Sequence, residues 1–244
     1  MPVFFIRTQD VVDGVITVAD PLLSHIAKSL RAKPGDHLIF NDVLGHRYHT
    51  TVHKITKQRL EATIQKVEPS PLSTTPPIIL AQALLKGEKM GWVIQKATEL
   101  GVSTIIPLIT DRVILRVSGN QNASHQTRWK RIALEAAQQS ERRTLPTILP
   151  IQTFQEFLKR PRQDKPILMA EREETGSLLT IPLSTENQNL GVTVCIGPEG
   201  GWSTEEIEMA KFHKWKFASL GKGILRAETA SLAALAILQA RFTA

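Results

Sequence analysis

The stretch Val192-Thr-Val-Cys-Ile-Gly-Pro-Glu-Gly-Gly-Trp-Ser-Thr-Glu-Glu206 decides the fold class of the second half of this 244-residue chain. Its first five residues, mostly β-branched or apolar, predict a buried strand. The spacing of Ser203 and Glu206 forms the capping-box pattern that begins a helix. A strand, a glycine loop and a capped helix in this order indicate an α/β domain, in which ligands bind at the loops that follow the strands.

The loop Gly197-Pro-Glu-Gly-Gly201 is the first candidate binding element. Glycine has no Cβ, so backbone N–H and C=O groups can approach a ligand closely. The loop matches neither the G-x-G-x-x-G pattern nor the Walker pattern, which counts against a standard dinucleotide fold and against nucleoside triphosphate hydrolysis. A tight turn without a ligand is the alternative.

Strand and helix patterns alternate on both sides of this element. Apolar runs predict strands over residues 78–83, 104–109, 167–170, 192–196 and 216–220. Amphipathic or capped segments predict helices over residues 88–100, 125–141, 204–213 and 228–242. Such alternation implies a parallel sheet covered by helices on both faces.

The first part of the chain has a different pattern. Short β-rich runs over residues 38–40, 48–55 and 60–67 are separated by turn signals, and residues 21–31 predict one helix. Four prolines within residues 68–77 favour extended chain. We therefore expect a small β-barrel domain over residues 1–70, a proline-rich linker over 71–77 and the α/β domain over 78–244.

Basic residues are concentrated in the middle of the chain. The whole chain has 30 Lys and Arg residues against 23 Asp and Glu residues, a formal charge of +7. Residues 71–143 contain 10 basic and 5 acidic residues, whereas residues 144–244 contain 11 of each. This distribution indicates a polyanionic partner for the middle segment, although charge alone does not identify a site.

The single cysteine, Cys195, excludes an intramolecular disulfide framework and a zinc site built on paired thiolates. No segment approaches the roughly 18 apolar residues of a membrane span, and the apolar run near the start is too short for a signal peptide. We expect a cytoplasmic protein with neither a membrane partner nor a metal.

A second candidate site lies in Leu220-Gly-Lys-Gly-Ile-Leu-Arg-Ala-Glu-Thr-Ala230. Here a glycine turn leads to Arg226 and Glu228 at the start of an almost wholly apolar helix. Charges beside so apolar a segment require partners, because burying an unpaired charge is costly. A structural ion pair or compensation of the helix dipole would explain the two residues equally well.

A third feature is a basic and polar helix face at Arg128, Arg131, Glu135, Gln138 and Arg142, which are spaced by three or four residues. Lys89 and Lys96, two helical turns apart, could extend it. Most charged helix faces are merely solvated, but this one lies in the most basic segment, so it predicts contacts with phosphate groups.

Five groups of residues form a specific set through their order and spacing. They are His25-Ile-Ala-Lys-Ser-Leu-Arg31, Gly87-Glu-Lys-Met90 with Gln95-Lys96 and Glu99-Leu-Gly-Val102, Arg128-Trp129 with Gln139 and Arg142, Ile196-Gly-Pro-Glu-Gly-Gly201, and Leu220-Gly221 with Ile224-Leu-Arg-Ala-Glu-Thr-Ala230. This set resembles the ribosomal RNA small subunit methyltransferase E family, whose members methylate N3 of a uridine in 16S ribosomal RNA and belong to the SPOUT superfamily. The resemblance spans nearly the whole chain, with two departures: Gly91 and Gln138 stand where many relatives have glutamate.

The resemblance implies a PUA-like β-barrel in the first domain and a SPOUT-type α/β domain whose C-terminal segments thread a deep trefoil knot. It also implies S-adenosylmethionine as cofactor and a homodimer whose interface uses the helix after Glu228. The residues implied to hold the cofactor are Glu171, Ile196, Gly197, Glu199, Gly200, Gly201, Leu220, Gly221, Ile224, Leu225 and Thr229.

For catalysis we hypothesise that Arg226 stabilises the uridine anion as N3 loses its proton, and that Glu228 orients Arg226 or relays that proton. The substrate is expected to be 16S ribosomal RNA, within the small ribosomal subunit. Residues expected to contact it are His25, Arg31, Lys89, Lys96, Arg128, Arg131 and Arg142. Two alternatives stay open: a SPOUT methyltransferase that acts on another RNA base, and a non-catalytic RNA-binding or ribosome-associated protein.

Overall fold

The computed structural model describes residues 3–71, 75–113, 119–171, 173, 176–183 and 190–243. The chain divides into two units. The first comprises Met1–Leu72 together with Ala137–Leu145, and the second comprises Ser73–Ala136 and Pro146–Ala244. Residues 137–145, which the predicted domain over residues 78–244 included, therefore belong to the N-terminal unit.

The first unit is built on a six-stranded mixed sheet with the strand order β1-β4-β5-β6-β3-β2. Its β1 pairs with β4 in parallel and the other neighbours are antiparallel. The elements are β1 (Val3–Phe5), η1 (Thr8–Asp10), β2 (Val11–Val12), β3 (Val15–Val18), α1 (Leu22–Ser29), β4 (His37–Asn41), β5 (Arg47–Ile55) and β6 (Leu60–Glu68). Phe4, Ile16, Ile26 and Phe40 are among the side chains that form its own buried core.

The segment 137–145 is fixed to this sheet by three polar contacts. The Asn41 side-chain amide donates to the Arg142 carbonyl over 2.7 Å, and Arg47 donates to the Glu141 carbonyl over 2.7 Å. The Arg143 guanidinium forms an ion pair with Glu68 at the end of β6. These contacts join residues 75 to 101 positions apart, which is why the sequence pattern did not reveal them.

The second unit contains an eight-stranded sheet in which every pair of neighbouring strands is parallel, in the order β10-β8-β7-β13-β11-β14-β12 with β9 beside β8. Its strands are β7 (Ile78–Ala83), β8 (Thr104–Ile109), β9 (Thr147–Ile148), β10 (Gln152–Thr153), β11 (Lys165–Met169), β12 (Gly176–Ser177), β13 (Val192–Ile196) and β14 (Lys216–Ser219). Its helices are α2 (Lys89–Glu99), α3 (Gly119–Gln139), α4 (Phe154–Leu158), α5 (Thr204–Phe212) and α6 (Ala227–Thr243).

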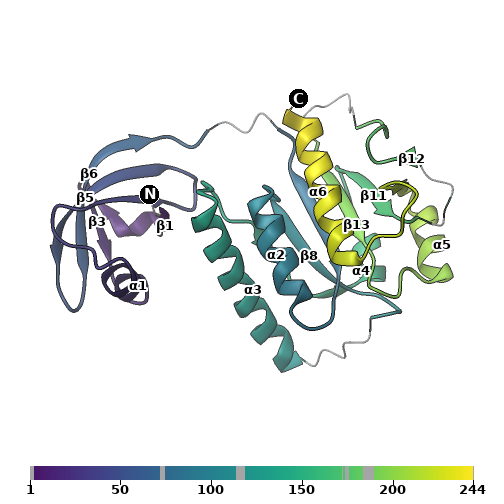
Figure 1. Ribbon diagram of the computed structural model, residues 1–244, viewed down its shortest axis with the longest axis horizontal. Coiled ribbons are helices and arrows are strands. Elements are labelled where there is room, and N and C mark those ends of the chain that lie inside the picture. Colours follow the sequence, from purple (N-terminus) through teal and green to yellow (C-terminus); the bar gives the residue numbers. More distant parts are fainter. Residues whose placement is uncertain are drawn as a thin grey trace. The chain divides into compact units, whose positions relative to one another are not determined.

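Helices cover both faces of this sheet (Figure 1). Because side chains alternate along a strand, Leu80 and Val194 face one core, which they share with α2, α3 and α6. Ala81 and Cys195, one position further along each strand, face a second core with α4 and α5. The predicted parallel α/β sheet is therefore confirmed.

The longest apolar runs gave the most accurate boundaries. Strands β7, β8 and β13 begin and end where the sequence predicts. Helix α3 begins at Gly119 and ends at Gln139, whereas the prediction was 125–141. The sequence pattern did not predict the short elements β1, β2, β3, β9, β10, β12 and α4. For the five-residue helix α4 a signal was present, because Thr153 and Glu156 form a capping box at its start.

Gly91, one of the two departures from the family pattern, lies where α2 meets α3. A Cβ at this position would lie 3.1 Å from Cδ1 of Ile132. Close packing of the two helices thus favours glycine here. Among the described helices, none is both long enough and apolar enough to cross a membrane.

Candidate active site

Because the strands of the second unit are parallel, the loops that follow them gather at one edge of the sheet. The glycine loop 197–201 follows β13 and the second glycine loop, 220–226, follows β14. Residues 84–88 follow β7, residues 110–113 follow β8, and Glu171 lies just beyond β11. The two candidate loops are thus at the edge where α/β proteins bind ligands.

A hydrogen-bonded clamp fixes the end of the first glycine loop. Ser203 and Glu206 cap α5 reciprocally: Ser203 N donates to Glu206 Oε2 over 2.9 Å, and Glu206 N donates to Ser203 Oγ over 3.1 Å. The same carboxylate accepts the backbone N–H of Asp111 over 2.9 Å, and Ser203 Oγ donates to the Asp111 carboxylate. The loop after β8 is thereby tied to the loop after β13.

Glu206 is the most deeply buried carboxylate of this clamp, with 1% of its surface exposed. Burial raises its pKa above the ordinary value, even though the N–H groups of Ser203 and Asp111 favour the ionised form. A buried carboxylate that accepts two backbone N–H groups rigidifies both loops at once.

Two glycines of the first loop are closely covered by side chains. A Cβ at Gly197 would lie 3.1 Å from the Trp202 ring, and one at Gly200 would lie 3.1 Å from Cβ of Arg112. Trp202 cannot easily move, because its indole N–H donates to the Met169 carbonyl over 2.9 Å. Arg112 donates to the Gly200 carbonyl over the same distance.

Lys89 connects the first glycine loop to the start of α6. Its ammonium lies 3.3 Å from Glu199 Oε1 and 3.5 Å from Glu228 Oε2. Burial would raise the pKa of Glu199, but hydrogen bonds from its own N–H, from Lys86 N–H and from Lys89 outweigh this and hold the pKa below its ordinary value. Two carboxylates and one ammonium therefore meet at this edge of the sheet.

Glu228 has an unused acceptor. Its Oε2 atom is buried, yet it accepts no hydrogen bond from the part of the chain that the structure describes, although Lys89 lies within ion-pair distance. Three positions further along the helix, Ser231 is fully buried and donates to the side chain of Gln82 near the end of β7. This polar pair anchors the first turn of α6 and so fixes the position of Glu228.

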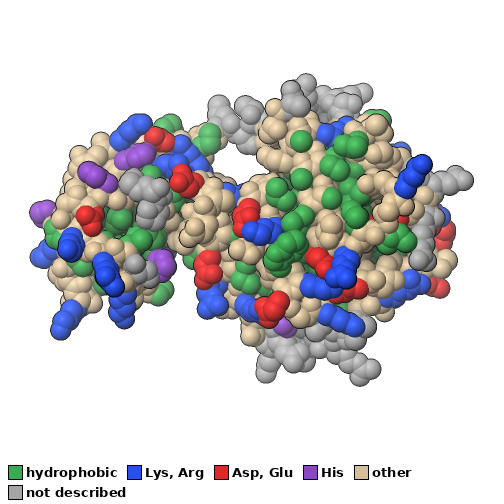
Figure 2. All heavy atoms as spheres, in the orientation of Figure 1, with side chains coloured by type: hydrophobic (Ala, Val, Ile, Leu, Met, Phe, Trp, Pro, Cys, Tyr) green, Lys and Arg blue, Asp and Glu red, His purple; other side chains and the backbone are tan. Residues whose placement is uncertain are grey.

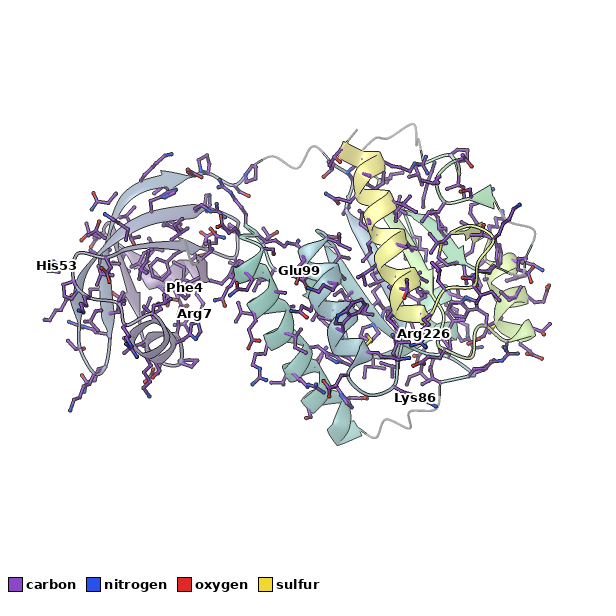
Figure 3. All side chains as sticks on the ribbon, in the orientation of Figure 1. Phe4, Arg7, His53, Lys86, Glu99 and Arg226 are labelled. Atoms are coloured by element: carbon purple, nitrogen blue, oxygen red, sulfur yellow. The ribbon has the colours of Figure 1, made fainter. Side chains whose placement is uncertain are left out.

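The second glycine loop combines buried anchors with exposed groups. Leu220 and Leu225 pack against the core, whereas Ile224 is 72% exposed. Gly221 adopts a φ of +121°, a conformation that favours glycine. Arg226 is exposed just before α6, and Figure 3 labels it together with Lys86 of the loop after β7.

The other predicted cofactor residues differ in accessibility. Ile196 is 2% exposed, so only its backbone is available at the edge of the sheet. Glu171 and Thr229 are exposed. In the part of the chain that the structure describes, the side chains of Glu228 and Arg226 form no hydrogen bond or ion pair, and the ion-pair partner of Glu228 is Lys89.

The predicted basic face is largely paired within the protein. Arg128 forms an ion pair with Glu88, Arg131 lies 3.6 Å from Glu135, and Lys96 lies 2.8 Å from Glu99. Arg128 and Arg131 also line a shallow hollow on α3 beside Thr127. These arginines remain partly exposed, at 43% and 72%.

Arg142 does not belong to the α3 face. The helix ends at Gln139, and Arg142 lies in the segment that belongs to the first unit. Burial lowers the pKa of its guanidinium. The prediction that Arg142 shares a helix face with Arg128 is therefore wrong, because the helix ends at Gln139, before it reaches Arg142.

His25 and Arg31, which the sequence predicts to contact RNA, are both exposed. His25 lies on α1 with its ring 6.0 Å from that of Phe4, and Arg31 follows the helix with a φ of +53°. Sequence reasoning missed Asp111, Arg112, Trp202 and Gln82 as residues that shape the site. For Asp111 and Arg112 the sequence held one signal, which is that they follow a predicted strand.

Comparison with known proteins identifies the family. The RNA methyltransferase domain family matches residues 73–239, and the RNA methyltransferase PUA domain family matches residues 18–65. The ribosomal RNA small subunit methyltransferase E of Synechocystis is 32% identical over 96% of this chain and 76% of its own length. The chain belongs to the ribosomal RNA small subunit methyltransferase E family.

A further relative and two solved structures are similar to this chain over nearly the same length. The Rickettsia conorii protein of the same name is 33% identical over 89% of this chain and 86% of its own. The ribosomal RNA small subunit methyltransferase E from Neisseria gonorrhoeae, bound to S-adenosyl methionine, is 30% identical, with a TM-score of 0.87 over 99% of this chain and 98% of its own. A Legionella pneumophila structure with bound SAM has a TM-score of 0.87 and 28% identity, over 98% and 97% of the two chains.

Proposed function

We propose that this enzyme transfers a methyl group from S-adenosylmethionine to N3 of a specific uridine in 16S ribosomal RNA, in the cytoplasm. The observation that carries the proposal is the junction of both glycine loops with the start of α6, where Lys89 lies between Glu199 and Glu228. The relatives with bound cofactor support the choice of S-adenosylmethionine.

The residues at this junction fit such a cofactor. S-adenosylmethionine carries a sulfonium, an ammonium and a carboxylate group, a net charge of about +1, and the two carboxylates of the junction exceed the single lysine charge by one. The unsatisfied Oε2 atom of Glu228 leaves an acceptor facing the junction. At Gly197 and Gly200, where a Cβ would be crowded by Trp202 and Arg112, the loop offers a ligand its backbone groups and no side chain.

We assign cofactor binding to the backbone of residues 196–201 and 220–225, with Glu171 and Thr229 as exposed neighbours. Rigid loops suit methyl transfer, because the site mainly has to hold nucleophile, methyl group and leaving sulfur in line. The Glu206 clamp and the Trp202 contact preorganise the first loop. S-adenosylmethionine supplies the methyl group.

The protein's own chemistry concerns the uridine. N3 must lose a proton, and Glu228 has a free acceptor atom, so proton relay is the role its surroundings favour over orientation of Arg226. Arg226 is exposed and shortly precedes Glu228 in the sequence, and it stabilises the negative charge that develops on the uracil ring. Lys89 holds Glu199 and Glu228 together.

The RNA must present an unpaired or extruded base, since N3 lies on the pairing edge. We propose that Arg128 and Arg131 of α3 contact its phosphates by exchanging their internal carboxylate partners for the RNA. The PUA-like unit, with the barrel architecture of its family, positions the RNA within the small ribosomal subunit. His25 and Arg31 belong to this surface.

We further propose a homodimer and a trefoil knot. Helix α6 is apolar around its circumference, and Leu232, Ala236 and Ala240 are partly or fully exposed on it. Hydrophobic side chains gather over α6 on the face seen in Figure 2, which a second copy of the chain would cover. The knot is supported by the return of the chain after β14 to α6, which packs on β7, β13 and α2.

Arg226→Ala tests the catalytic assignment. Ribosomal RNA from a strain lacking the gene is analysed by nucleoside mass spectrometry after complementation with the wild type or the variant. We expect N3-methyluridine to return only with the wild type, and calorimetry to show S-adenosylmethionine affinity within a few-fold for both. Full restoration by Arg226→Ala would overturn the role of this residue.

A further inference from the structure

The first unit segregates its basic side chains. Of the nine basic residues within residues 3–71 of this unit, four have partners: Arg7 pairs with Asp10, Arg59 with Glu61, Lys66 with Glu68, and Arg47 donates to Asn41 and to the Glu141 carbonyl. The side chains of the other five form no ion pair or hydrogen bond with any described residue. These five are Lys28, Arg31, Lys33, Lys54 and Lys57.

The five unpaired side chains come from segments that the fold brings together. Gly35 N donates to the Val52 carbonyl over 2.8 Å, and Val52 N donates to the Asp36 carbonyl over the same distance, which joins the loop after α1 to β5. Ala27, Ala32 and Ile55 pack on the same core. In Figure 2, lysine and arginine side chains gather at the end of the unit that carries α1 and the turn between β5 and β6.

The carboxylates in these segments are engaged locally. Asp20 accepts the N–H of Ser24, and Asp36 accepts the N–H of Lys33, each through a short hydrogen bond to the backbone. Five cations against these two carboxylates leave an excess of three positive charges. This end of the unit is therefore strongly basic.

A hollow of about 640 Å³ lies in the middle of this end, between α1 and the turn from β5 to β6. Leu23, Ala27 and Ile55 contribute apolar surface to it, while Lys28 and Lys57 stand at its border. Asp20 supplies one acceptor. An apolar surface flanked by two lysines is the combination that accepts a base and its neighbouring phosphates.

We infer that this hollow binds one unpaired nucleotide of the substrate RNA, with the base against Leu23, Ala27 and Ile55 and the adjacent phosphates at Lys28 and Lys57. The inference rests on the proposed function, which it deepens by placing a second, non-reacting nucleotide on the first unit. Duplex RNA does not fit, because its bases are stacked and paired while its phosphates lie on the outside.

The test compares two double variants of the full chain with equal loss of charge. Lys28→Ala/Lys57→Ala removes the two lysines of the hollow, and Arg7→Ala/Lys66→Ala removes two ion-paired cations elsewhere on the unit. Binding of fluorescein-labelled octauridine and of a 12-base-pair RNA duplex is measured by anisotropy over a range of salt concentrations.

The first variant should bind octauridine about ten-fold more weakly, and its salt dependence should flatten by about 1.4 in log–log slope, as expected for two lost phosphate contacts at roughly 0.7 each. The control variant should lose no more than about two-fold. Equal losses in both variants, or an equal loss for the duplex, would overturn the inference.

Methylation separates this inference from the proposed function. On 16S ribosomal RNA, Lys28→Ala/Lys57→Ala should raise KM for RNA while kcat stays within about two-fold of the wild type. An unchanged KM together with unchanged octauridine binding rejects the hollow but leaves the methyltransferase intact. A wild type that transfers no methyl group rejects the proposed function, and the octauridine comparison still decides the hollow.

Discussion

The ammonium of Lys89 lies 3.5 Å from an oxygen of Glu228 that accepts no hydrogen bond from the described residues. The same ammonium is 3.3 Å from Glu199, which is 29 positions earlier in the chain than Glu228. Lys89, expected from its sequence position to contact RNA, thus lies between two carboxylates of the proposed active site.

Replacing Lys89 tests this placement. Lys89→Met leaves two carboxylates facing each other without a cation, so we expect kcat for methylation to fall by about 10² or more, within the range of general acid–base contributions. KM for RNA should change little. The matched control is Lys96→Met on the same helix, since the ion-pair partner of Lys96 among the described residues is Glu99. A rise in KM for RNA without a fall in kcat would contradict this placement and show that Lys89 contacts the RNA.

The first glycine loop should not tolerate a methyl group at position 197. Gly197→Ala drives a Cβ against Trp202, whose ring is held by Met169 and packed against Phe154. Overpacking of this kind costs about 1–3 kcal/mol, and we expect S-adenosylmethionine affinity measured by calorimetry to fall about ten-fold or more. Gly176→Ala is the control, because Gly176 lies in β12, outside both glycine loops, and its Cβ would meet nothing within 4 Å. Equal affinities for the two variants would refute the assigned role of the loop.

The buried carboxylate of Glu206 should stabilise both loops. Glu206→Gln loses one acceptor, so the N–H of Ser203 or Asp111 is left without a partner, at a cost of about 1–3 kcal/mol in the free energy of unfolding. Urea denaturation measures this directly. Glu205→Gln, an exposed neighbour in the same helical turn, should leave the midpoint within error. Similar midpoints for both variants would contradict the clamp.

Glu68 should make the stability of the first unit depend on pH. Hydrogen bonds from Lys66, Arg143 and His49 lower the pKa of its carboxyl from 4.5 to about 2. Because the folded state holds this proton less tightly than the unfolded chain, the stabilisation is complete above pH 4.5 and disappears as the pH falls towards about 2.

The variant Glu68→Gln isolates that contribution. Its denaturation midpoint should lie below that of the wild type at pH 7, and the two midpoints should converge as the pH approaches 2. A difference that stays constant over this range would show that the carboxyl charge of Glu68 does not stabilise the contact with Arg143.

The sequence predicted the second unit well where apolar runs were long and sharply bounded. The strands β7, β8 and β13 are buried on both faces, so most of their residues are apolar, and β8 and β13 end where Thr110 and Gly197 follow. The strands of two or three residues in the first unit contain too few side chains to show a period, which explains why β1 and β2 were missed.

The site was predictable in its loops and less so in its contacts. Both glycine loops stand out locally, because turn chemistry and helix capping act over a few residues. The links from Lys89 to Glu199 and from Asp111 to Glu206 join residues about a hundred positions apart, and only the strand order brings them together. For the same reason helix periodicity placed Arg142 with Arg128, although the chain has left α3 before that residue.

The most direct test of the central claim uses the purified protein, S-adenosylmethionine with an isotopically labelled methyl group, and small ribosomal subunits from a strain that lacks the gene. The 16S ribosomal RNA is then digested to nucleosides and analysed by mass spectrometry. We expect labelled N3-methyluridine to rise to one residue per 16S molecule. Label in another nucleoside, or no label in the RNA, would contradict the account.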